Sequence, residues 1–189
     1  MTPVIRTTVA GPDAARMDDL RGARPDPFLA FRHDPAAVLA RLERLEREAG
    51  GPGATPAEAP LRELVAHLER QFATHMAAED HVLYPALRSA FPEARGTLDP
   101  LLADHAELRQ LRAALARLLD GAPAPARDEQ VAVLARDLAD LLRLHIRREE
   151  SVVLDVAARV LNHDELSAMA VGLDAWRNAH PETRAPEGR

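Results

Sequence analysis

Four long stretches of this chain repeat apolar residues at intervals of three and four positions, which is the spacing of one face of an α-helix. Clusters of proline and glycine separate the stretches, and they lie at 12–27, 50–60, 85–100, 121–125 and 181–188. Because such clusters interrupt regular structure, the pattern predicts four long helices. Short loops between successive helices favour an antiparallel up-down-up-down four-helix bundle.

The composition of the chain also favours an all-α fold. Leucine and alanine dominate the apolar residues, whereas aromatic residues make up only 3% of the chain and isoleucine occurs twice. These residue types favour helices over strands. We therefore expect one bundle domain over residues 26–180, with tails at 1–25 and 181–189.

Two sequence patterns predict where helices begin. Asn162 followed three positions later by Glu165 is typical of a helix cap, so a short fifth, C-terminal helix is expected to begin there and to end near Trp176. Thr55 followed by Glu58 predicts in the same way that the second long helix has its cap at Thr55.

Charge and cysteine content exclude several classes of function. The 30 acidic residues outnumber the 24 basic ones, which are all arginine, so a nucleic-acid partner is not expected. The absence of cysteine excludes disulfides, thiol catalysis and cysteine-ligated metal sites. There is no apolar signal segment at the N-terminus and no run of about 18 apolar residues, so we expect a cytoplasmic protein without a membrane partner.

Histidines carry the functional information in this chain. His75 and His145 are each followed four positions later by a glutamate, Glu79 and Glu149. This spacing places the imidazole and the carboxylate on one face of a helix, one turn apart, where both can reach the same metal ion. The two pairs lie on the second and fourth predicted helices, and His105 lies on the third. We therefore expect the five side chains to meet in the bundle core.

Any one of these residues alone is more simply a buried histidine satisfied by a carboxylate, or part of a solvated face. Several polar groups in one core, however, each cost several kcal/mol when they lack a counter-charge. Two divalent cations would neutralise the glutamates and accept the lone pairs of neutral imidazoles. The pattern thus favours a metal site, and a metal-free interaction bundle is the minor alternative.

The order H, HxxxE, H and HxxxE on four successive helices resembles the hemerythrin family of HHE cation-binding domains. The resemblance covers about residues 26–179 and rests on the segments HMAAEDHVLYPAL, DHAELRQL and HIRREESVVL. It implies a four-helix bundle with a non-haem di-iron centre. The iron ligands that it implies are His75, Glu79, His105, His145 and Glu149.

The family also places a ligand histidine on the first helix, where His33 is the only histidine available. The two HxxxE pairs lie 70 residues apart, and this repeat aligns Pro35, not His33, with His105. His33 is then two positions out of register, about 200° round a regular helix. A helix broken or started at Pro35 would allow His33 to turn inward. The sequence supports both a ligand and a non-ligand role for His33.

Iron ions with open coordination positions imply a protein that binds or senses a small diatomic ligand, O₂ or NO, or that handles iron. The alternative is a di-iron enzyme that turns over peroxide or nitric oxide, with electrons from a partner that the sequence does not identify. The turns around the site are apolar, as at Leu68, Phe72 and Ile146, and offer no evident inward serine, lysine or arginine. Such a pocket favours binding over catalysis.

Overall fold

The computed structural model describes residues 35–48 and 57–181, which are helical almost throughout and contain no strand. This confirms the predicted all-α fold. The first part of the described chain forms α2 (Pro35–Glu48), α3 (Glu58–Gln71), the π-helical turns η2 (Phe72–Met76) and η3 (Glu79–Leu83), and α4 (Tyr84–Ala90). The rest forms the short 3₁₀ helix η4 (Pro92–Ala94), α5 (Arg95–Asp120), α6 (Pro125–Arg148), the π-helical turn η5 (Glu149–Val153), α7 (Leu154–Val160) and α8 (His163–Ala179).

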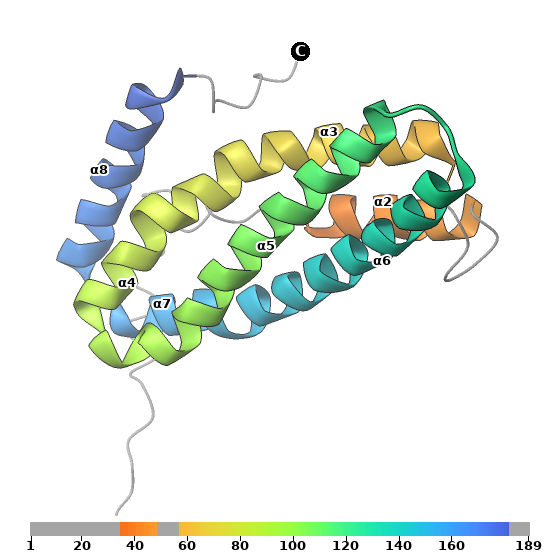
Figure 1. Ribbon diagram of the computed structural model, residues 1–189. Coiled ribbons are helices and arrows are strands. Elements are labelled where there is room, and N and C mark those ends of the chain that lie inside the picture. The colour runs from red at the N-terminus through yellow and green to blue at the C-terminus, as the bar shows by residue number, and fades with distance from the viewer. Residues whose placement is uncertain (1–34, 49–56, 182–189) are drawn as a thin grey trace, which may run out of the picture.

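The long helices lie side by side, and α8 runs across one end of them (Figure 1). α5 and α6 follow each other closely and pack together, α3 packs on α5, and α2 contacts both α3 and α6. At the other end of the chain, α8 packs on η3 and α4. Within the described ranges, no helix combines the length and the apolar character that crossing a membrane requires.

The cap of the fifth helix is confirmed. The Asn162 side chain accepts hydrogen bonds from the backbone N–H groups of Asp164 at 2.9 Å and Glu165 at 3.0 Å. In return, the Glu165 carboxylate accepts a 2.7 Å hydrogen bond from the backbone N–H of Asn162. This reciprocal capping box fixes the start of α8.

The prediction for the start of the second long helix is wrong by two residues. The helix begins at Glu58 with Ala57 as its extended cap residue, and Thr55 lies outside the described residues. Pro60 supplies the physical reason. In a helix that started at Pro56, Pro60 would have to donate a backbone hydrogen bond that it cannot make. A start at Glu58 places Pro60 in the first turn, where backbone N–H groups have no partner within the helix.

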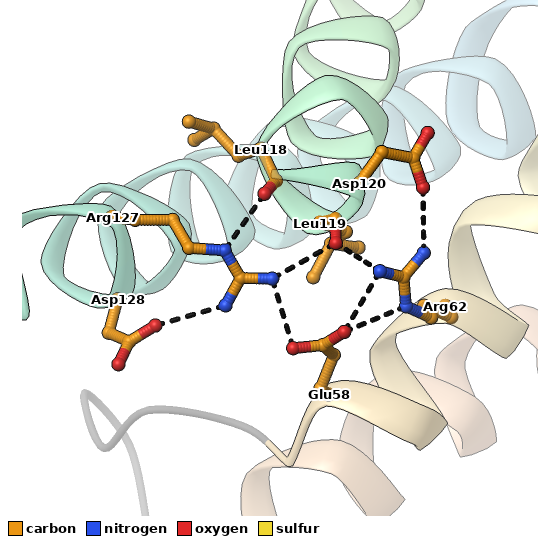
Figure 2. Close-up of polar contacts among 7 residues, drawn as sticks. All are labelled: Glu58, Arg62, Leu118, Leu119, Asp120, Arg127 and Asp128. Atoms are coloured by element: carbon orange, nitrogen blue, oxygen red, sulfur yellow. Dashed lines mark hydrogen bonds and ion pairs between the residues drawn. The ribbon is translucent and has the colours of Figure 1, made fainter. Parts of the chain in front are cut away.

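A network of arginines joins three helix ends at the end of the bundle away from α8 (Figure 2). Arg127 donates hydrogen bonds to the carbonyl oxygens of Leu118 at 2.9 Å and Leu119 at 3.0 Å, and Arg62 also donates to Leu119. Glu58 joins the two arginines, with 2.9 Å contacts to each. The arginines thereby satisfy carbonyl groups at the end of α5 that have no partner within the helix and carry partial negative charge.

The core consists of two apolar clusters with a polar layer between them. On α5, Leu101 belongs to one cluster and Leu108 to the other, and His105 lies between them in sequence. Along α6 and η5, Ile146 belongs to the cluster of Leu108 and Val153 to the cluster of Leu101, and Glu149 lies between them in sequence. The buried polar and charged residues of the described chain are Glu79, Asp104, His105, His145 and Glu149.

Candidate metal centre

The polar layer contains all five of the expected ligands that lie in the described residues. His75 lies in η2, Glu79 is the first residue of η3, and Glu149 is the first residue of η5. His105 and His145 project from α5 and α6. Regular α-helix was expected throughout, so the three π-helical turns are a difference from the prediction. Such turns occur often at functional sites, because they change the direction in which side chains leave a helix.

The two glutamates connect the two sides of the cluster. Glu79 places Oε1 3.1 Å from Nε2 of His75 and Oε2 3.5 Å from Nε2 of His105. Glu149 places Oε1 3.7 Å from Nε2 of His75 and Oε2 3.7 Å from Nε2 of His145. The Nε2 atoms of His105 and His145 are 3.2 Å apart. Each carboxylate therefore has one oxygen toward His75 and the other toward either His105 or His145.

Two groups of three residues bring their donor atoms within 4.8 Å of one another. One group contains Glu79, His105 and His145, and the other contains His75, Glu79 and Glu149, so Glu79 belongs to both. Glu79 and His105 have no exposed surface, whereas the side chain of His75 is 11% exposed. The site thus has a deeper side and a side nearer to solvent.

Burial shapes the protonation of the cluster. Burial, followed by repulsion from Glu149, raises the pKa of Glu79 well above its ordinary value of 4.5. Burial, followed by repulsion from His105, lowers the pKa of His145 from 6.5 to about 4. His145 is therefore neutral at physiological pH, which is the form of imidazole that binds metals.

The donor set fits a bound cation. Both carboxylate oxygens of Glu79 are buried without a hydrogen-bond partner, which is costly in a protein core. A cation between the carboxylates would supply the missing partner and counter-charge. Imidazole nitrogen together with carboxylate oxygen suits iron and other first-row transition metals.

A pair of charged residues, Asp80 and Arg109, lies behind the imidazole of His105. Asp80 contacts Nδ1 of His105 at 2.6 Å and accepts a 2.6 Å hydrogen bond from Arg109. Asp80 thus occupies a supporting position behind His105. Arg109 was not identified from the sequence, although it lies four positions after His105, which is one helical turn.

A cavity of about 30 Å³ adjoins His75, His145 and Glu149. This volume accommodates a molecule of one or two heavy atoms. Leu68, Phe72 and Ile146 line it as expected, and there is no serine, lysine or arginine among the described residues of its wall. The remaining lining residues are Val38, Gln71, Met76 and Leu142.

The other histidines of the described chain lie outside the cluster of five residues, and His33 is not among the described residues. The role of His33 therefore stays a prediction. His67 lies on α3 with Nε2 buried and without a hydrogen-bond partner, and burial, followed by repulsion from Arg41, lowers its pKa. His81 faces Trp176 of α8, with ring centroids 6.3 Å apart. Tyr84 is 1% exposed and stacks on His105.

A comparison with family models matches residues 27–157 to the hemerythrin HHE cation-binding domain. The searches of curated proteins and of solved structures gave no significant match. The matched range includes all five residues of the cluster and ends before α8.

Proposed function

Because the chain belongs to the hemerythrin HHE cation-binding domain family, we propose that its cluster holds two iron ions that are bridged by Glu79 and Glu149. His105 and His145 bind one ion, and His75 binds the other. His33, which lies outside the described residues, is the candidate for a further ligand. In this proposal the helices form an antiparallel up-down-up-down four-helix bundle, with each ligand-bearing helix contributing from one face.

The observation that supports this proposal best is the placement of the four carboxylate oxygens. Each glutamate directs one oxygen toward His75 and the other toward His105 or His145. A single cation would require only one oxygen of each carboxylate, whereas two cations use both. The two donor groups share Glu79, which suits a bridging position.

The function that follows is the binding or sensing of a small diatomic ligand, O₂ or NO, with iron handling as a related role. Bound iron supplies open coordination positions and electrons, which O₂ and NO require. The chain supplies a cavity of about 30 Å³ against His75, His145 and Glu149, with mainly apolar walls. Such walls admit small neutral molecules and exclude larger polar substrates. The described wall provides no cationic group to hold a substrate.

The first test is the metal content of the full chain after anaerobic reconstitution with Fe²⁺. About two iron ions per chain are expected, and Glu79→Gln and Glu149→Gln should each lower the content. Glu107→Gln is a matched control, because Glu107 is an exposed glutamate on α5. Native protein with less than a few tenths of an iron per chain would contradict the metal function.

The second test is rapid mixing of the reduced protein with O₂, with NO, and with peroxide plus a reductant. Stoichiometric, reversible binding of O₂ or NO is the expected result. Sustained peroxide or NO consumption that depends on Glu79 and Glu149, at rates well above those of free iron, would instead identify a di-iron enzyme.

A further inference from the structure

The imidazole of His105 is fixed by specific polar and ring contacts in addition to apolar packing. Its side chain has no exposed surface, and its Nδ1 lies 2.6 Å from the Asp80 carboxylate. The other oxygen of Asp80 accepts a 2.6 Å hydrogen bond from Arg109. The ring of Tyr84 stacks on the imidazole, with centroids 5.6 Å apart and planes inclined by 26°. Both the position and the rotation of the imidazole are therefore restricted.

The Asp80 contact also selects a tautomer. A carboxylate only accepts hydrogen bonds, so Nδ1 of His105 carries the proton and donates a hydrogen bond to Asp80. Both carboxylate oxygens of Asp80 are engaged, one with His105 and the other with Arg109. Nε2 then keeps its lone pair, and it lies 3.5 Å from Oε2 of Glu79. This is the tautomer that binds a metal through Nε2.

His145 provides an internal comparison. Its Nδ1 lies 3.7 Å from Asp104, which is beyond hydrogen-bond distance. Arg148 holds Asp104 through two contacts of 2.8 and 3.0 Å, so an arginine and an aspartate stand behind this histidine as well. The arrangement around His145 is thus a looser version of the arrangement around His105.

We propose that Asp80, anchored by Arg109, is a positioning residue that fixes the metal-binding tautomer of His105 and makes the His105 side the tighter of two metal positions. The inference rests on the proposed two-metal function. An imidazole that is already oriented loses little freedom when a metal binds, and carboxylates behind ligand histidines typically contribute about 10- to 100-fold in metal affinity. The position beside His75, whose side chain is 11% exposed, fills second and empties first.

The tautomer can be tested without metal. Long-range ¹H–¹⁵N correlation spectra of the full metal-free chain report which ring nitrogen of each histidine carries the proton. We expect His105 of the native protein to be protonated on Nδ1 and Asp80→Asn to populate the other tautomer. Asp80→Glu keeps the carboxylate and should restore Nδ1 protonation in part. An unchanged His105 spectrum in Asp80→Asn would overturn the positioning role.

The affinities of the two metal positions are measured by anaerobic Fe²⁺ titration with competing chelators. His105→Ala should remove the tighter binding step and His75→Ala the weaker one, which assigns each step to its position. Asp80→Asn should weaken the tighter step about 10- to 100-fold and the weaker step by less than about 3-fold. Asp104→Asn should have a smaller effect, and Asp174→Asn, at an exposed site on α8, none. Arg109→Gln is the milder variant should Asp80→Asn not fold, and it should weaken the same step.

Three outcomes separate the two proposals. Two steps of equal affinity in the native protein, or equal losses at both steps in Asp80→Asn, would overturn the present inference and leave the metal function standing. The absence of metal binding in the native protein would overturn both the metal function and the ranking of the two positions. The tautomer of His105 in the metal-free chain would then still decide whether Asp80 positions it.

Discussion

Replacing Glu79 by glutamine should stabilise the metal-free protein while weakening its metal binding. Glu79 is fully buried, and burial together with repulsion from Glu149 raises its pKa well above 4.5. Each unit of that rise costs the folded state about 1.4 kcal/mol at a pH above the raised value. Glutamine has nearly the same volume, carries no charge, and can donate a hydrogen bond to Glu149.

The expected gain is about 1–4 kcal/mol near neutral pH, which is the range by which replacing a buried ion pair with apolar residues of similar volume can stabilise a protein. In a chain of this length, a gain of about 2 kcal/mol corresponds to an increase in Tm of about 4–8 °C. The pH dependence has a definite sign. Below pH 4.5 the carboxyl is protonated in both the folded and the unfolded chain, so the gain vanishes there and grows as the pH rises.

The measurement is urea and thermal unfolding of chelator-treated native protein and Glu79→Gln across this pH range, beside iron titrations of both. Glu107→Gln, at an exposed position on α5, should change neither stability nor metal binding appreciably. Equal stability of native protein and Glu79→Gln at neutral pH would refute the reasoning, as would a gain that does not change with pH.

Three further predictions concern stability. The contribution of His145 to the stability of the metal-free protein should fall by about 3 kcal/mol as the pH falls from 6.5 toward about 4, because burial lowers the pKa of His145 from 6.5 to about 4. In urea unfolding, the native protein should therefore lose about that much stability relative to His145→Gln over this range. Leu138→Ala removes a fully buried side chain of α6 and should cost about 2–5 kcal/mol in urea unfolding, whereas Val133→Ala, at a 45% exposed position on α6, should cost far less. Asn162→Ala breaks the capping box of α8 and should cost about 1 kcal/mol, and a loss smaller than about 0.3 kcal/mol in calorimetry would show that α8 is fixed by packing alone.

The two histidine–glutamate pairs of the cluster could be predicted because the spacing within each pair is a local property of a helix. His75 with Glu79, and His145 with Glu149, are each four positions apart, so any helix that includes them presents both to one side. The apolar residues around each pair fix which side is buried. The capping box at Asn162 was predictable for the same reason, since all of its hydrogen bonds span three residues or fewer.

The π-helical turns and the charged residues behind the histidines could not be predicted in this way. Asp80 and His105 are 25 positions apart, and their contact depends on how two helices pack. The Arg148 contact with Asp104 spans 44 positions and has the same origin. A π-helical turn needs only one extra residue per turn, so the apolar periodicity of the sequence is too coarse to detect it. α3 starts two residues after the position that the cap pattern at Thr55 predicts, because Pro60 cannot donate the backbone hydrogen bond that the earlier start requires.

The place of the polar layer between two apolar clusters predicts that the protein keeps its fold when metal is removed. One apolar cluster packs α2 and α3 against α5 and α6, and the other packs α4, α7 and α8 against the start of α5. Neither cluster contains any of the five proposed ligands, so removal of metal should leave both in place and confine the electrostatic cost to the layer between them. In that layer, the raised pKa of Glu79 allows a proton to take the place of the cation, which limits the cost. Metal binding must then release that proton, so affinity should rise with pH over the range in which Glu79 titrates.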